Sequence, residues 1–272
     1  MVDRHTQALS FGSQSGVYEA ARPGYPRAAV DWVLELLGEK AFTVSEGNRP
    51  LRFADIGAGT GKLTRVLREV NDAVVAIDPD PNMLVQLRAV VPGVETMEGR
   101  GEEIPLSDGS CDAVFFGQSW HWTDPLRASH EVGRVLTSDG VLGLLWNSRD
   151  VSVPWVRRYA EIIGGSASER LIEADDVRVG APFTALEHTV VEWSMPMTAG
   201  TLRHLVSSRS PYITSEPEEK ERVDRHLTVL FEELGLGKDT VIDLPYKTHC
   251  YRAHKAGGEE TSRGFHIEPK VI

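Results

Sequence analysis

Short apolar segments alternate with amphipathic helical patterns between residues 51 and 146, and this alternation restricts the fold more than any other feature. The predicted strands cover residues 51–56, 74–78, 94–97, 112–116 and 141–146. After the first of them, Leu63, Val66 and Leu67 recur at intervals of three and four residues, as on one face of a helix. Strands that are nearly all apolar are typical of parallel sheets covered on both faces. The pattern predicts an open α/β sheet with helices on both faces.

Further elements are predicted on either side of this region. They are helices over residues 26–37 and 155–163 and strands over residues 190–193, 241–244 and 248–252. A charged helix between the late strands begins at Ser215-Glu216-Pro217-Glu218, which has capping-box spacing. The chain then holds a sheet of about seven strands, mostly parallel with an antiparallel late strand.

The charge balance and the cysteines restrict the class of protein. The 272 residues carry 29 Lys and Arg against 40 Asp and Glu, a net charge of −11, which argues against nucleic acid and anionic membranes as partners. Cys111 and Cys250 are too few for a disulfide framework. The longest apolar run, residues 141–146, is too short to span a bilayer, and the first residues lack an apolar signal core. We expect a cytoplasmic protein.

The most informative motif is Asp55-Ile56-Gly57-Ala58-Gly59-Thr60-Gly61, between the first strand and the following helix. Glycines allow a tight turn, and a helix amino terminus offers unpaired N–H groups to a ligand. A dinucleotide fingerprint needs its third glycine at position 62, which is Lys62 here. Asp55 suits an ammonium group better than a pyrophosphate. The motif therefore favours a zwitterionic or cationic cofactor.

This motif resembles that of the class I S-adenosylmethionine-dependent methyltransferases, and the resemblance covers about residues 50 to 150. It implies a Rossmann-like fold and S-adenosyl-L-methionine as the cofactor. It also implies that Asp55 lies near the methionine amino group, and that the backbone of Gly57, Ala58 and Gly59 lies against the cofactor.

Two later segments fit the same resemblance. Asp78 ends the second strand, where a carboxylate can accept hydrogen bonds from both ribose hydroxyls, although it could also serve only as a turn residue. Pro79 and Met83 would line the adenosine site. After the third strand, Gly101 and Glu102 are the candidate adenine contacts. Arg100 stands where many relatives have Asp, and Glu102 could equally be an exposed charge.

The segment Gly117-Gln118-Ser119-Trp120-His121-Trp122 resembles the Gln-x-x-His-Trp variant of a subgroup around the trans-aconitate methyltransferases. At the end of a central strand it should face the reactive methyl group. Gln118 is a candidate contact to cofactor or substrate. His121 is the candidate catalytic base, with helix capping between packed tryptophans as the alternative.

Other candidates lie outside the central region. In the amino-terminal cover, Tyr18 could close over the cofactor and Arg22 could pair with its carboxylate. The alternatives are a packed aromatic ring for Tyr18 and an ordinary ion pair at a helix end for Arg22. Ser207-Ser208-Arg209-Ser210 could hold an anionic substrate, or it could be a polar helix end. The spacing of His249, Cys250 and His254 fits no zinc pattern, so we expect no metal.

We therefore expect methyl transfer to a small-molecule acceptor, with O- or carboxyl-methylation favoured, by in-line displacement that releases S-adenosylhomocysteine. A nicotinamide-dependent oxidoreductase, opposed by Lys62, and a non-catalytic regulator that binds S-adenosylmethionine are the alternatives. The chain is expected to have four parts. Residues 1–42 form a cover with the first helix, and residues 43–150 form the cofactor-binding core. Residues 151–253 form a lobe with acceptor-pocket elements and the last two strands, and residues 254–272 form a flexible tail.

Overall fold

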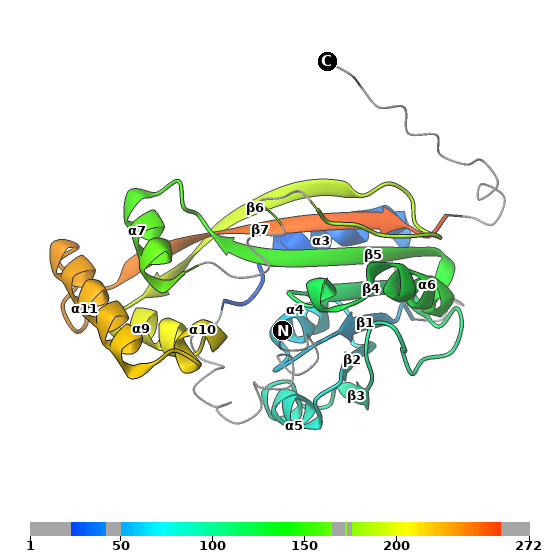
Figure 1. Ribbon diagram of the computed structural model, residues 1–272. Helices are drawn as coiled ribbons and strands as arrows, with labels where there is room; N and C mark the ends of the chain where they lie inside the picture. Colours follow the sequence, from blue (N-terminus) through cyan, green and yellow to red (C-terminus); the bar gives the residue numbers. More distant parts are fainter. Residues whose placement is uncertain (1–22, 42–49, 165–171, 173–175, 257–272) are drawn as a thin grey trace, which may run out of the picture.

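In the computed structural model, which describes residues 23–41, 50–164, 172 and 176–256, seven strands form one sheet in the order β3-β2-β1-β4-β5-β7-β6. The strands are β1 (Phe53–Ile56), β2 (Val74–Asp78), β3 (Glu95–Glu98), β4 (Cys111–Gly117), β5 (Leu136–Arg149), β6 (Glu187–Met197) and β7 (Ile242–His254). The first five run parallel, and β7 lies antiparallel between β5 and β6 (Figure 1). This confirms the predicted mostly parallel sheet with an antiparallel late strand.

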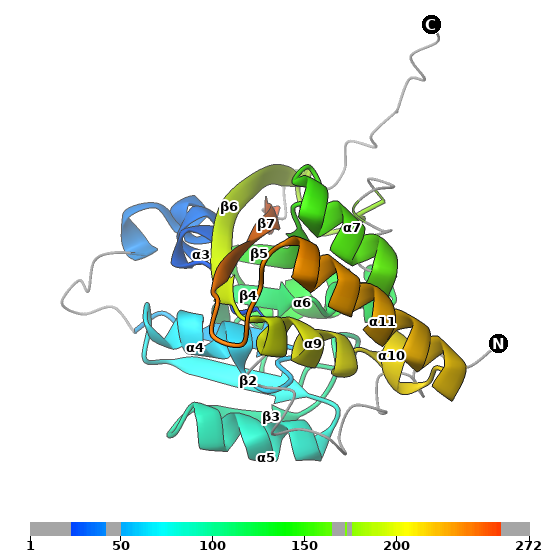
Figure 2. The same ribbon diagram turned by 90° about the vertical axis from the view of Figure 1, so that its left-hand side faces the viewer.

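Helices cover both faces of the sheet. Those of the core are α3 (Arg27–Leu34), α4 (Lys62–Arg68), α5 (Pro81–Val90) and α6 (Pro125–Val135), with the 3-10 turns η2 (Glu35–Ala41) and η3 (Trp120–Trp122). α3 and α4 pack on one face, around Phe53 and Phe115, and α6 packs on the other, around Val114 and Phe116. Figures 1 and 2 show α3 and α6 on opposite sides of the sheet.

A lobe projects beyond the carboxyl end of β5 and forms a third apolar core. It comprises α7 (Pro154–Ile163), α9 (Ala199–Ser207), α10 (Ser210–Ile213) and α11 (Pro217–Glu233). These helices gather at one end of the long strands β6 and β7 (Figure 1). Tyr159, Leu202 and Leu227 pack there against Leu244 and Tyr246 of β7. The sheet therefore continues from the core into the lobe.

The predicted late elements differ from the structure in two respects. The predicted strands over 241–244 and 248–252 are one strand, β7, because its pairing with β6 continues through residues 245–247. The capping box predicted at Ser215 is wrong. Pro217 occupies the first turn of α11, so the extended Glu216 precedes the helix, and its side chain makes no capping hydrogen bond. A capping box occurs instead at α9, between Thr198 and Thr201.

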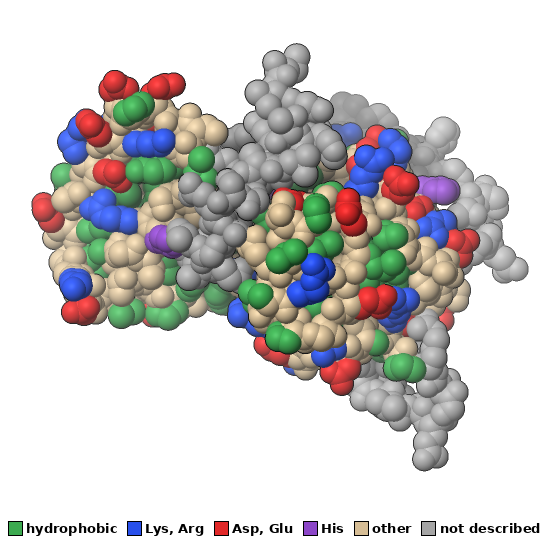
Figure 3. Space-filling model, turned by 90° about the horizontal axis from the view of Figure 1, so that it is seen from below, with side chains coloured by type: hydrophobic (Ala, Val, Ile, Leu, Met, Phe, Trp, Pro, Cys, Tyr) green, Lys and Arg blue, Asp and Glu red, His purple; other side chains and the backbone are tan. Residues whose placement is uncertain are grey.

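The surface shows no single-sign patch on the face in Figure 3, where acidic and basic side chains are interspersed over the core and the lobe. None of the helices in the described ranges combines the length and apolar character that a membrane span needs.

Candidate functional site

The glycine turn lies where the carboxyl ends of β1, β2 and β4 meet. Gly57, Gly59 and Gly61 have φ angles of 68°, 53° and 87°, which place all three in the left-handed region that favours glycine. The N–H groups of Gly57 and Ala58 donate to the Ile77 carbonyl at 2.8 and 3.0 Å. The turn is thereby held against the end of β2.

Ser119 fixes the other side of this turn. Its hydroxyl donates to the Ile56 carbonyl at 2.6 Å, and a Cβ added to Gly57 would come within 2.5 Å of the Ser119 Cβ. At Gly59, by contrast, no atom of the described chain lies within 4 Å of such a Cβ. The turn is closed toward Ser119 and open at Gly59, where a ligand can approach the backbone. Sequence reasoning gave Ser119 no role, although a hydroxyl directly after Gln118 at a strand end was the available signal.

Asp55 is fully buried at the base of the turn. Its Oδ2 accepts a 2.6 Å hydrogen bond from the Thr64 hydroxyl, whereas its Oδ1 accepts none from the described residues. Burial raises its pKa from 3.8 to about 7, assisted by the nearby Asp78 carboxylate and opposed by the Thr64 hydrogen bond. A buried oxygen without a donor would be satisfied by an ammonium group. The sequence did not identify Thr64 as a partner of Asp55.

Asp78 connects β2 to the glycine turn. Its Oδ2 accepts from the Gly59 N–H at 2.8 Å and its Oδ1 from the Asp80 N–H at 2.9 Å. Burial raises its pKa, while these two backbone hydrogen bonds act in the opposite direction. Each oxygen keeps a second acceptor site for a ribose hydroxyl. Of the predicted adenosine contacts, Pro79 is half-buried and Met83 is buried.

The predicted adenine loop is folded against the start of α6. Gly101 is buried, and a Cβ there would approach Thr123 within 2.9 Å. The Oε1 atom of Glu102 accepts the Asp124 N–H at 2.7 Å. One carboxylate oxygen of Glu102 is therefore engaged within the protein, and the contact of Glu102 with adenine stays a prediction.

Gln118 lies at the same edge in a conformation unusual for a side chain larger than glycine. Its φ is 56°, and two hydrogen bonds of 2.9 Å hold it there, from its N–H to the Leu145 carbonyl and from its Nε2 to the Asn147 carbonyl. The structure thus places Gln118 directly before Ser119, which contacts the glycine turn. Tyr18 and Arg22, the predicted cover residues, lie outside the described residues.

His121 packs against the Trp122 ring, and its Nδ1 accepts a 3.3 Å hydrogen bond from the Trp146 indole. The neutral ring therefore carries its proton on Nε2. Burial lowers its pKa to about 4, so it is neutral and weakly basic near pH 7. The capping alternative is wrong, because the Asp124 carboxylate accepts the N–H groups at the start of α6. Base catalysis by His121 stays a prediction that this geometry disfavours.

Changing His121 to Asn should separate base catalysis from packing. An Asn Oδ1 can still accept the Trp146 indole hydrogen, so we expect His121→Asn to keep turnover within about threefold of the unchanged enzyme, with no inflection near pH 6.5. His121→Ala should lower the melting temperature more than His121→Asn. A loss of two orders of magnitude in kcat for the folded Asn variant would restore the base assignment.

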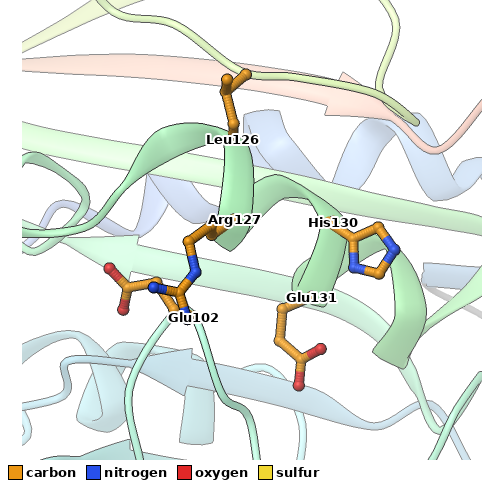
Figure 4. Close-up of a pocket in the computed structure, with 5 residues that line it drawn as sticks. All are labelled: Glu102, Leu126, Arg127, His130 and Glu131. Carbon is orange, nitrogen blue, oxygen red and sulfur yellow. The ribbon is translucent and has the colours of Figure 1, made fainter.

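A surface pocket of about 320 Å³ lies beside α6 (Figure 4). It is lined by Glu102, Leu126, Arg127, His130 and Glu131. Only Glu102 belongs to the predicted site, and Glu131 is engaged by Arg134 and by the Ile104 N–H. The pocket therefore adjoins the adenine loop without reaching the glycine turn.

The remaining candidates lie in the lobe and on β7. Arg209 is buried and donates to the carbonyls of Ile163 and Gly164 at 2.9 and 2.8 Å, so it closes the end of α7. Ser207 and Ser208 donate to carbonyls of their own helix, as expected for a polar helix end. Within the described ranges, no three His, Cys, Asp or Glu side chains are grouped as metal ligands.

Comparison with known proteins gives a consistent result. Residues 54–144 match the family model of a methyltransferase domain. An uncharacterized methyltransferase of Mycobacterium tuberculosis, Rv3342, is 43% identical over 251 residues, which cover 92% of this chain and 97% of that protein. A malonyl-[acyl-carrier protein] O-methyltransferase of Pectobacterium atrosepticum is 30% identical over 136 residues, half of each chain.

A solved structure supports the fold alone. The crystal structure of a candidate type II methyltransferase from Anaeromyxobacter dehalogenans superimposes with a TM-score of 0.59 at 20% identity, and the match covers 87% of this chain and 99% of that one.

Proposed function

Because the chain belongs to the class I S-adenosylmethionine-dependent methyltransferases, we propose that it methylates an oxygen, preferably a carboxylate oxygen, of a small anionic acceptor. The cofactor is S-adenosylmethionine, in place of the nicotinamide of the alternative reading. Membership of the trans-aconitate subgroup remains a prediction. The observation that carries the acceptor proposal is a buried arginine at the carboxyl end of β5.

The residues present at the glycine turn fit the cofactor. The Oδ1 atom of Asp55, which accepts no hydrogen bond from the described residues, suits the ammonium group of the cofactor. At Gly59 the same part of the chain leaves the backbone open to the cofactor. When bound, S-adenosylmethionine supplies a methyl group activated by a positively charged sulfur, and an acceptor oxygen displaces S-adenosylhomocysteine, which leaves with the carbon–sulfur electron pair. The protein then has to bind the cofactor and the acceptor, align the acceptor oxygen with the methyl group, and exclude water. A carboxylate acceptor needs no base, which agrees with the weak basicity of His121.

Arg149 is placed to select such an acceptor. It ends β5 two residues after Asn147, whose carbonyl holds the Gln118 side chain, and it is only 9% exposed. Guanidinium groups bind carboxylates in a bidentate manner. We place Arg149 at the anionic end of the acceptor, next to the methyl-transfer edge.

A second arginine reinforces the positive field of the lobe. Burial raises the pKa of the Tyr159 hydroxyl, while the charges of Arg149 and Arg209 act in the opposite direction. Arg209 is also only 9% exposed. Two buried guanidinium groups whose fields reach the same phenol favour an acceptor that carries negative charge. The O-methylation attributed to the Pectobacterium relative agrees with an oxygen acceptor.

The test is a panel of carboxylic acids, neutral alcohols and amines incubated with labelled S-adenosylmethionine, with products identified by mass spectrometry. We expect methyl esters from carboxylic acids. Arg149→Met should raise the acceptor KM about tenfold or more with little change in cofactor affinity, and Arg149→Lys should raise it less.

Arg158→Met is the matched control, because Arg158 is exposed and pairs with Glu233 on the outside of the lobe. It should leave the acceptor KM unchanged. Preferential methylation of neutral alcohols or amines, or an unchanged KM in a folded Arg149→Met variant, would contradict the acceptor class.

A further inference from the structure

Asn147 is a buried polar residue that the proposed function has not used through its side chain. It is 7% exposed and lies on β5 opposite Thr248 of β7. Its Nδ2 donates to the Gly24 carbonyl at 2.8 Å, and its Oδ1 accepts from the Thr248 hydroxyl at 2.7 Å. The side chain thus joins the sheet to the segment that precedes α3, 123 residues earlier in the chain.

The hydrogen bonds around Asn147 have a fixed direction. The Trp193 indole donates to the Thr248 hydroxyl at 2.9 Å, and that hydroxyl donates in turn to the Asn147 Oδ1. The Gly24 carbonyl can only accept a hydrogen bond, so the Asn147 NH₂ must point toward it. The amide cannot reverse without losing this hydrogen bond, because its oxygen would then face the carbonyl oxygen. The Gly24 carbonyl is therefore held in one position.

The residue that this contact positions is Tyr25. Its hydroxyl lies against Gly117 at the end of β4, so closely that a Cβ on Gly117 would come within 2.8 Å of the hydroxyl oxygen. The same Cβ would also meet Leu63 of α4 at 3.0 Å. Gln118 follows Gly117 directly. The Tyr25 hydroxyl consequently lies at the strand end where the glycine turn, Ser119 and Gln118 meet.

We propose that Asn147 is a positioning residue of the methyl-transfer site, which places the Tyr25 hydroxyl at the edge of the cofactor site by holding the Gly24 carbonyl. Tyr25 then contacts the bound cofactor with a polar group that the glycine turn and the two carboxylates do not provide. The inference rests on the methyltransfer reaction proposed above, but it does not depend on the acceptor class.

The test measures binding of S-adenosylhomocysteine, which requires no acceptor, by calorimetry on the full chain. Asn147→Ala should weaken binding about tenfold and Tyr25→Phe about three- to tenfold. The double variant should bind no more weakly than Asn147→Ala alone, because the hydroxyl acts only when it is positioned. Thr248→Val, which removes the donor to Oδ1, should give a smaller loss than Asn147→Ala.

Asn71 provides a matched control. Its Nδ2 donates to the Leu51 carbonyl and its Oδ1 accepts the Ala73 N–H, both at 2.8 Å, so it also links two backbone segments, but at the amino-terminal end of the strands. Asn71→Ala should lower the melting temperature without changing the affinity for S-adenosylhomocysteine. Dissociation rates measured by stopped flow should rise for Asn147→Ala and not for Asn71→Ala.

Three outcomes would overturn the assignment. They are unchanged binding in a folded Asn147→Ala variant, additive losses in the double variant, and an equal loss of binding in Asn71→Ala. Failure of the acceptor proposal would show itself differently, as normal binding of S-adenosylhomocysteine without methyl-ester formation. If Asn147→Ala does not fold, the pair Tyr25→Phe and Thr248→Val answers the same question.

Discussion

Replacing Asp55 by Asn is expected to stabilise the cofactor-free protein above pH 7 and to remove most of its affinity for S-adenosylmethionine. Burial raises the pKa of Asp55 from 3.8 to about 7, so the folded protein favours the protonated acid. The stabilisation from this group is complete below pH 3.8 and is lost as the pH rises through about 7. This pKa shift corresponds to a loss of about 4 kcal/mol in the free energy of unfolding. The Asn side chain does not ionise, so the variant does not suffer this loss.

In the presence of the cofactor, the unchanged Asp55 is favoured over Asn. A cationic ligand favours the ionised carboxylate, so its affinity for the unchanged protein should rise between pH 6 and 8. Asp55→Asn should abolish that rise and weaken binding about 100-fold, because the amide hydrogens oppose an ammonium group. Urea unfolding at pH 5.5 and 8, together with calorimetry over the same range, measures both effects.

Asp112→Asn is the control for removing a buried carboxylate elsewhere. Its Oδ2 accepts the Arg52 N–H at 2.9 Å, at the opposite end of the strands from the glycine turn. We expect that variant to bind the cofactor normally. Undiminished affinity in Asp55→Asn, or an affinity of the unchanged protein that is independent of pH, would contradict the ammonium assignment.

Gly57→Ala is expected to lower the free energy of unfolding by about 3 kcal/mol and to abolish measurable cofactor binding. The left-handed backbone costs an L-residue about 1–2 kcal/mol, and the new methyl group would collide with the Ser119 Cβ at 2.5 Å. Because Ser119 also holds the Ile56 carbonyl, it cannot move without releasing the turn. Chemical denaturation and calorimetry give the two quantities.

Two further variants separate the causes. Gly59→Ala has the same backbone penalty without a collision in the described chain, so it should cost about 1–2 kcal/mol of stability while still obstructing the ligand. Adding Ser119→Gly to Gly57→Ala should restore part of the stability by removing the colliding Cβ. If the double variant is no more stable than the summed losses of Gly57→Ala and Ser119→Gly measured separately, the steric explanation fails.

The sequence predicted those parts of the candidate site whose positions follow from short stretches of the chain. Asp55 and Asp78 lie at the ends of strands that are visible in the hydropathy pattern, and the glycines follow the first of these strands. Parallel strands bring their carboxyl ends to one edge. The same pattern placed Gln118 at that edge. These positions needed no knowledge of which distant segments touch.

The residues that the sequence did not predict depend on contacts between distant segments. Ser119 bonds to Ile56, 63 residues away, and Asn147 to Gly24, 123 residues away. The preference of Ser and Asn for turns and caps gives no indication of such partners. The continuation of β7 through Pro245 has the same origin, because its pairing with β6 outweighs the local signal for a break.

The place of β7 between β5 and β6 has a consequence for the order of assembly during synthesis. Among the strands that the structure describes, β6 pairs only with β7, so residues 187–197 leave the ribosome long before their partner, residues 242–254. β1 to β5 can pair as soon as residue 149 has emerged, whereas the lobe side of the sheet waits for nearly the whole chain. A chain stopped before residue 242 would therefore lose two strands of the sheet, not one, and with them the hydroxyl of Thr248 that orients Asn147.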